Sequence, residues 1–167
     1  MPDAGEQAIV DFVTNGGGLI LTEWIAYEVQ SNRYNILKTI MPMFRTAGFT
    51  GTDTYSVIKS HPVTLGLDSA FSLYVSGNKN GIAHSGEVLV TGPQSGDAVV
   101  ADEVGSGRVV QLATAGNYSA GQPFLDLNMQ KLLTNAVNWV SGASWLRFTP
   151  ENDTIPASSS LDLIVST

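Results

Sequence analysis

The stretch VTNGGGLILTEW, residues 13–24, constrains the fold more than any other part of this chain. Upstream of its glycines, apolar side chains recur at helical spacing and predict a helix over residues 4–14. Gly16 ends that helix, because glycine adopts a left-handed backbone at little cost. The apolar run over residues 19–22 is too short for a buried helix and has the length of a buried parallel strand. A helix followed by such a strand indicates an α/β fold.

The same glycines could be read as a phosphate-binding loop. Such a loop follows a strand and opens a helix, so that the ligand meets the helix N-terminus. Here the order is helix, glycines, strand. The sequence therefore favours a helix stop and a tight entry into the sheet over a nucleotide site.

The remaining elements are predicted from the same periodicities. Segment 98–113, AVVADEVGSGRVVQLA, has two alternating apolar runs around a glycine-rich turn and predicts a β-hairpin. Residues 126–140 have the spacing of an amphipathic helix whose first turn carries Asp126. Weaker patterns predict a helix over 34–44 that Pro42 kinks or cuts short, a turn around Pro62, and strands over 54–59, 71–75 and 87–91.

The last part of the chain differs in composition from the rest. Residues 143–167 are rich in Ser and Pro and contain β-like runs over 145–149 and 161–165. Two isolated strands are marginally stable in water. We therefore expect an α/β domain over 1–142, followed by a truncated β-domain segment or linker over 143–167.

Charge and composition exclude several classes of partner. The 167 residues carry a formal charge of -7, with 8 Lys and Arg against 15 Asp and Glu and no basic cluster, which disfavours nucleic acid and anionic membranes. No run approaches the roughly 18 apolar residues of a membrane span. There is no cysteine, so disulfides and thiol chemistry are absent. The low fraction of charged residues, 14%, resembles that of bacterial secreted or surface proteins. The start of the chain lacks a signal-peptide pattern. We expect an extracellular or cell-surface location in the parent protein.

Four blocks occur in an order that resembles a known family: IVDFVTNGGGLILTEW, SHPVTLGLDSAFSLY, VVADEVGSGRVVQLATAGN and LLTNAVNWV. They resemble the class I glutamine amidotransferase-like fold and, within it, the trehalose-utilisation-type branch. The resemblance implies a three-layer, flavodoxin-like α/β sheet with a β-hairpin and a short C-terminal β extension. The tail from Ser144 is similar to the start of the immunoglobulin-like repeats of large bacterial surface proteins.

The resemblance also implies an incomplete sheet. Members of this fold begin with one or two β-α units ahead of the helix predicted at residues 4–14. Without them, the strand at 19–22 would have an unpaired edge, which favours aggregation or strand exchange. We expect a homodimer or strand exchange to cover that edge.

Ligands of open α/β sheets bind at the carboxyl ends of the strands. The resemblance places a catalytic cysteine after the first of these strands and a histidine after the second. This sequence has Thr22-Glu23-Trp24 at the first position and residues 114–118, TAGNY, at the second, so neither catalytic residue is present. No Gly-x-Ser-x-Gly elbow occurs either, and Ser76 and Ser85 are the least implausible nucleophiles.

Glu23 and His61 are the candidate catalytic residues. A carboxyl group at the end of a buried strand could be a general base or a metal ligand with a raised pKa, because burial disfavours its charged form. The alternative is a helix-start or surface glutamate. His61 in SHPVTLGL is either adjacent to a site or a loop histidine that bonds the backbone ahead of Pro62.

Aromatic and amide side chains near the strand ends are candidate ligand-binding residues, because such sets suit sugars and other polar ligands. The alternative is aromatic filling around an inert crevice. Asp53, Asp68 and Asp126 could offer oxygen atoms to calcium, but no spaced acidic loop supports a metal site, and we expect no other cofactor. The ligand-binding candidates are Trp24, Tyr27, Tyr74, Asn117 and Tyr118.

Two functions follow from these residues. The first is a noncatalytic, amidotransferase-like binding or structural module of a larger bacterial secreted or surface protein, with a small-molecule or carbohydrate ligand. The alternative is a hydrolase of esters or carbohydrate derivatives that uses Glu23, His61 and a metal ion. Fold analogy cannot choose between them, because one fold hosts many chemistries.

Overall fold

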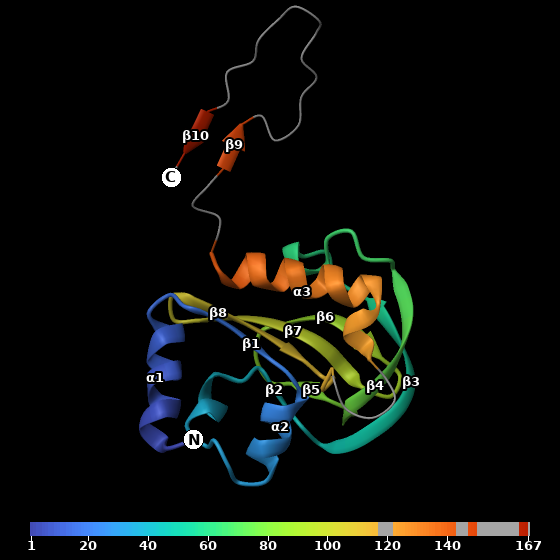
Figure 1. Cartoon of the computed structure of the whole chain (residues 1–167), viewed down its shortest axis with the longest axis horizontal. Coiled ribbons are helices and arrows are strands. Elements are labelled where there is room, and N and C mark those ends of the chain that lie inside the picture. The colour runs from blue at the N-terminus through green and yellow to red at the C-terminus, as the bar shows by residue number, and fades with distance from the viewer. Residues whose placement is uncertain (117–121, 143–146, 150–163, 167) are drawn as a thin grey trace, which may run out of the picture.

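The computed structural model describes residues 1–116, 122–142, 147–149 and 164–166. Within these residues, α-helices lie around a curved sheet (Figure 1). The helices are α1 (Asp3–Thr14), α2 (Glu23–Gln30) and α3 (Leu127–Val140), with 3-10 turns η1 (Leu37–Ile40), η2 (Pro62–Thr64) and η3 (Pro123–Leu125). The strands are β1 (Gly18–Leu21), β2 (Met43–Phe44), β3 (Ala47–Val57), β4 (Ala70–Lys79), β5 (Ile82–Ala83), β6 (Glu87–Gly92), β7 (Gly96–Val104), β8 (Gly107–Leu112), β9 (Arg147–Thr149) and β10 (Ile164–Ser166).

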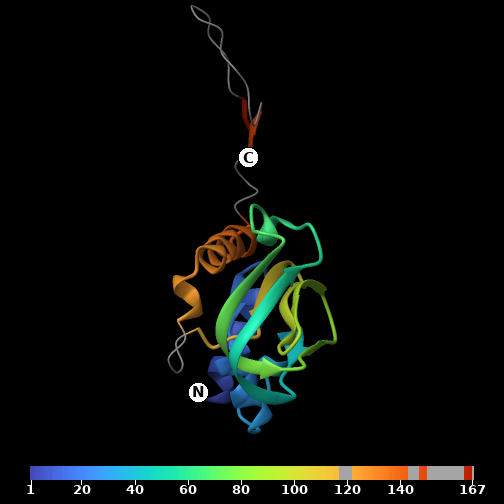
Figure 2. The same cartoon turned by 90° about the vertical axis from the view of Figure 1, so that its right-hand side faces the viewer.

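Six strands form the main sheet, in the order β1-β8-β7-β6-β3-β4. β1 runs parallel to β8, with Leu19 opposite Val109, and the other neighbouring pairs are antiparallel. An isolated bridge joins Gly77 of β4 to Thr114, just beyond β8. The sheet therefore curls, so that β4, at the opposite edge from β1, returns to the end of β8 (Figure 2).

Helices cover both faces of the sheet (Figure 1). On one face, Met129, Leu132 and Ala136 of α3 pack on the strands. On the other, Val13 of α1 and residues of α2 and η1 pack around Val109. Because neighbouring strand residues point to opposite faces, β8 contributes Val109 to one core and Val110 to the other. The predicted three-layer α/β class is thus confirmed.

The three glycines have the structural role predicted for them. Gly16 has a φ of 110°, a backbone conformation that would be strained in a residue with a side chain. The Gly17 N–H donates to the Phe12 carbonyl at 2.9 Å, which closes α1. At Gly18, a Cβ atom would lie 2.2 Å from the Val140 carbonyl oxygen, so only glycine lets β1 lie this close to the end of α3.

The long elements were predicted correctly from the sequence. The helices at residues 4–14 and 126–140, the parallel strand at 19–22 and the hairpin of β7 and β8 are confirmed. The strands predicted over 54–59, 71–75 and 87–91 correspond to β3, β4 and β6, of which the first two are longer than expected. In the tail, β9 and β10 pair antiparallel, with Phe148 opposite Val165. The division of the chain at residue 142 stays a prediction.

The helix predicted over 34–44 is wrong. Only η1 is helical there, and β2 follows it and pairs with β5. The carboxylate of Glu6 accepts hydrogen bonds from the Ile36 and Leu37 N–H groups at 2.9 and 3.2 Å, so a tertiary contact fixes the start of this segment. Pro42 then prevents a helix from continuing.

No helix within the described residues is long and apolar enough to cross a membrane.

Candidate functional site

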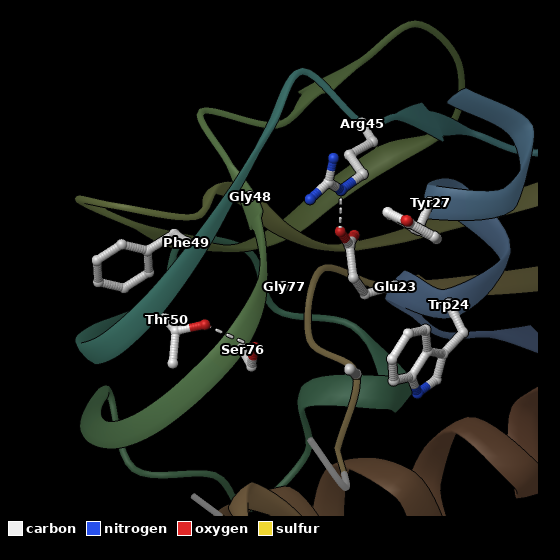
Figure 3. Close-up of a pocket in the computed structure, with 10 residues that line it drawn as sticks. Glu23, Trp24, Tyr27, Arg45, Gly48, Phe49, Thr50, Ser76 and Gly77 are labelled. Carbon is white, nitrogen blue, oxygen red and sulfur yellow. Dashed lines mark hydrogen bonds and ion pairs between the residues drawn. The ribbon is translucent and has the colours of Figure 1, made fainter. Parts of the chain in front are cut away.

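A cavity of about 350 Å³ opens at the carboxyl ends of β1 and β8. This Glu23 pocket lies between α2, the segment that follows β2, the β3–β4 pair and the residues after β8 (Figure 3). It is at the sheet edge where ligands of α/β folds bind. Its lining residues are Glu23, Trp24, Tyr27, Arg45, Gly48, Phe49, Thr50, Ser76, Gly77 and Ala115.

Glu23 lies directly beyond β1 and is the first residue of α2. Its N–H group donates to the Thr114 carbonyl at 3.3 Å, which ties the start of the helix to the end of β8. The residue is 5% exposed. Glu23 is therefore both a helix-start residue and a buried one, two descriptions that the sequence presented as alternatives.

Arg45 is the partner of the Glu23 carboxyl group. Its Nε donates to Glu23 Oε1, and its Nη1 donates to Gln30 Oε1. The guanidinium carbon also lies 5.3 Å from the centre of the Tyr27 ring, within reach of a cation–π interaction. The arginine is thus held by three side chains from α2, as Figure 3 shows in part.

The second carboxyl oxygen of Glu23, Oε2, is buried and has no hydrogen-bond partner among the described residues. Burial raises the pKa of Glu23 to about 7, while the hydrogen bond and the positive charge of Arg45 act in the opposite direction. The carboxyl group therefore exists in both protonation states near neutral pH. It can donate or accept a hydrogen bond inside the pocket.

Aromatic side chains form the rim of the pocket. Trp24 and Tyr27 are 40% and 41% exposed, and their rings meet edge to face at 6.3 Å and 89°. On the opposite wall, the hydroxyl groups of Thr50 and Ser76 lie 2.8 Å apart in a hydrogen bond (Figure 3). The pocket combines an aromatic corner, two hydroxyl groups and a buried ion pair.

The other predicted ligand-binding residues lie elsewhere. Tyr74 is exposed on β4 opposite Thr52 and does not line the pocket. Asn117 and Tyr118 are outside the described residues. Of the predicted set, the structure brings Trp24 and Tyr27 together with Glu23.

His61 lies in a different cavity from Glu23. Its Nδ1 accepts from the Val63 N–H at 3.1 Å and caps η2, and its ring meets Trp139 edge to face at 4.9 Å. Burial lowers the pKa of His61. The surrounding cavity, of about 400 Å³, is lined by His61, Gly86, Glu87, Ala101, Asp102, Glu103 and Trp139.

The aspartates considered for calcium make hydrogen bonds within the protein. The Asp53 carboxylate accepts from the backbone N–H groups of Thr54, Gln94 and Ser95. Asp126 caps α3, and Asp68 pairs with Asn128. Among the described residues, no three histidine or acidic side chains are grouped so that they could hold a metal ion.

The candidate serines also differ in their surroundings. Ser76 lines the Glu23 pocket and bonds Thr50. The hydroxyl of Ser85 donates to Asp102 at 2.6 Å on the exposed surface. Among the described residues, the hydroxyl partners of these serines are Thr50 and Asp102 rather than a histidine, the base that a serine nucleophile commonly uses.

Sequence reasoning missed Arg45, which lies one residue beyond the segment 34–44 that was predicted as a helix. It also missed two buried amides, Asn78 and Gln111, which are 1% and 0% exposed. A glutamine inside the apolar run VVQLA was a signal, because a buried amide needs hydrogen-bond partners.

Comparisons with known proteins bear on the fold. No protein-family profile and no curated sequence matches this chain. Two solved structures of cytoplasmic proteins from Salmonella typhimurium are similar, with 17% and 21% identity and TM-scores of 0.67 and 0.69. The matches cover 84% of this chain and 62% and 61% of theirs, so the chain spans about three fifths of their length.

A protein described as ThuA-like, from Parabacteroides merdae, is 13% identical with a TM-score of 0.65, and the match covers 93% of this chain and 69% of that one. At these identities the likeness shows the fold alone. The chain has the ThuA-like, flavodoxin-like α/β fold, which agrees with the trehalose-utilisation-type branch expected from its motifs.

Proposed function

We propose that this ThuA-like fold serves as a noncatalytic module that binds a small polar ligand, of the carbohydrate class, in the Glu23 pocket. One observation carries the proposal: Glu23 lines the cavity, and its buried Oε2 has no hydrogen-bond partner among the described residues. A buried polar atom left without a partner costs about 1 to 3 kcal/mol. A ligand hydroxyl that bonds Oε2 would remove this cost.

The rest of the pocket supports a sugar-like ligand. A volume of about 350 Å³ is within the range of small-molecule sites. Trp24 and Tyr27 offer flat apolar surfaces to the C–H face of a sugar ring, and both have polar atoms at their edges. Ser76 and Thr50 add hydroxyl groups on the facing wall.

The residues at the strand ends support binding without catalysis. Where the amidotransferase-like fold carries its cysteine, this chain has Glu23, and it contains no cysteine. Ala115 follows β8 in the pocket wall. His61 lines a separate cavity. We infer that the chain is a module of a larger bacterial secreted or surface protein, in keeping with its low fraction of charged residues and its Ser-rich tail.

Calorimetric titration with a panel of neutral monosaccharides and disaccharides tests this function. We expect at least one to bind the wild type, and Glu23→Gln to weaken that binding about tenfold, since one charged hydrogen bond is worth roughly 1.4 kcal/mol or more. Glu28→Gln is the matched control, because Glu28 is on the same helix but pairs with Arg33. Absence of binding across the panel, or equal weakening by both variants, would contradict the proposal.

A hydrolase is the second candidate, and the raised pKa of Glu23 favours it. A carboxyl group with a pKa of about 7 has the protonation equilibrium that a general acid or base needs. The test is hydrolysis of activated esters and glycosides by the wild type and Glu23→Gln, with and without a chelator. Turnover by the wild type that is lost in Glu23→Gln would show a hydrolase in place of a noncatalytic module. Turnover that is lost when the chelator is added would implicate a metal ion such as calcium.

A further inference from the structure

The segment that carries Arg45 has little regular structure to hold it. It lies between η1 and β3, and its only strand, β2, pairs with β5 over two residues. Arginine side chains have many rotamers, so their direction depends on a fixed backbone. The backbone of residues 43–46 is held by hydrogen bonds to buried side chains of the main sheet.

Gln111 holds one end of this segment. It belongs to β8, and its side chain is fully buried. Its Oε1 accepts from the Met43 N–H at 2.9 Å, and its Nε2 donates to the Met43 carbonyl at 2.9 Å. These two hydrogen bonds tie the Met43 backbone to β8, in addition to the short pairing of β2 with β5.

Asn78 of β4 holds the other end. Its Nδ2 donates to the Phe44 carbonyl at 3.2 Å, and its Oδ1 accepts from the Thr46 N–H at 3.1 Å. These two groups flank Arg45 on both sides. The Asn78 N–H donates to the Ala113 carbonyl at 2.8 Å, so the side chain projects from backbone that is itself fixed.

We propose that Asn78 and Gln111 are positioning residues of the Glu23 pocket, which fix residues 43–46 so that the Arg45 guanidinium lies against the Glu23 carboxyl group. Each amide uses both its donor and its acceptor on the same short segment. Neither is in the lining of the pocket. The inference rests on the proposed function only in taking this pocket as the binding site.

The protonation of Glu23 reports on the position of Arg45. Arg45 lowers the pKa of Glu23 through a hydrogen bond and through its charge. If the segment moves, both effects weaken and the pKa of Glu23 rises. A purely structural role of Asn78 would lower stability without changing this pKa.

The experiment is an NMR titration of the Glu23 side-chain carboxyl carbon, assigned with Glu23→Gln. We expect Asn78→Ala to raise the pKa of Glu23 by about one pH unit from its wild-type value. The reference is the pKa of Glu23 in Arg45→Met, where the hydrogen bond and the charge of Arg45 are lost completely. Asn128→Ala is the control, since Asn128 is also a buried amide but bonds Asp68. A pKa unchanged in a folded Asn78→Ala variant would overturn the proposal, whether or not a saccharide binds.

Two further measurements apply if Asn78→Ala does not fold. Gln111→Met has nearly the same volume and should raise the pKa of Glu23 in the same direction; no rise would count against the role of Gln111. In the wild type, the Met43 and Thr46 amide protons should be protected from hydrogen exchange, because they bond to the two amides. Rapid exchange at both would overturn the proposal.

Discussion

Glu23 differs from the other buried carboxyl groups of the described residues in how its oxygen atoms are bonded. Asp53 accepts three backbone hydrogen bonds, and Glu6 accepts two. Glu23 accepts one bond, from Arg45, and its buried second oxygen has no partner among the described residues. Buried polar atoms are bonded in the great majority of cases, so this exception, at a residue that lines the cavity, supports the ligand site proposed above.

The stability of the protein should depend on pH through Glu23. The pKa of Glu23 is about 7 in the folded state against 4.5 for an unperturbed glutamate, so between these pH values the unfolded state loses this proton first. The contribution of Glu23 is therefore fully present below pH 4.5 and is lost as the pH rises to about 7. The loss amounts to about 3 kcal/mol of unfolding free energy.

Urea denaturation at pH 4.5 and pH 8 measures this effect. We expect the stability difference between wild type and Glu23→Gln to change by about 3 kcal/mol between the two pH values, in the direction that favours the variant at pH 8. Glu28→Gln controls for the loss of a surface carboxylate on α2. A pH-independent difference between wild type and Glu23→Gln would show that Glu23 titrates normally.

The helices differ in how their N-termini are capped, although polar residues precede both α2 and α3. The Asp126 side chain accepts from the N–H groups of Asn128 and Met129 at 2.8 and 3.2 Å. Thr22, at the corresponding position of α2, makes no side-chain capping bond. The start of α2 relies instead on the Glu23 N–H bond to Thr114.

Asp126→Ala should therefore destabilise the protein by about 1 kcal/mol, and Thr22→Ala should have a much smaller effect. The unfolding free energy from urea denaturation checks both variants at the same pH. Equal losses in the two variants would contradict this assignment of the caps.

Elements with strong local patterns were predictable from the sequence. Gly105 and Gly107 mark the β7–β8 turn, and Asp126 marks the start of α3. Segment 34–44 was not predictable, because contacts from Glu6 and Gln111, far away in the sequence, decide its conformation. Its helical pattern was overridden by tertiary hydrogen bonds.

At the scale of the whole molecule, the curl of the sheet assembles the pocket. It brings Ser76 and Gly77 of β4 beside Ala115, which follows β8. Glu23 could be predicted, since the position after a buried parallel strand is where α/β ligands bind. Arg45, Thr50 and Ser76 could not be assigned to the same pocket, because nothing local in the sequence indicates the long β3–β4 pairing.

The open edge of β1 leads us to predict that two copies of the chain associate. β1 is the terminal strand of the six-stranded sheet, and among the described strands it pairs with β8 alone. An unpaired edge favours pairing with another chain. We expect a homodimer, and light scattering should give twice the chain mass of 17.7 kDa. A mass of 17.7 kDa at all accessible concentrations would contradict this expectation.

The most direct test of the central claim is an NMR chemical-shift titration of isotope-labelled protein with neutral disaccharides. The claim is that the Glu23 pocket is a ligand site, so shift changes should centre on Trp24, Tyr27, Arg45 and Ser76 and should be much reduced in Glu23→Gln. No change with any disaccharide, or changes centred on His61 and Trp139 in the second cavity, would contradict it.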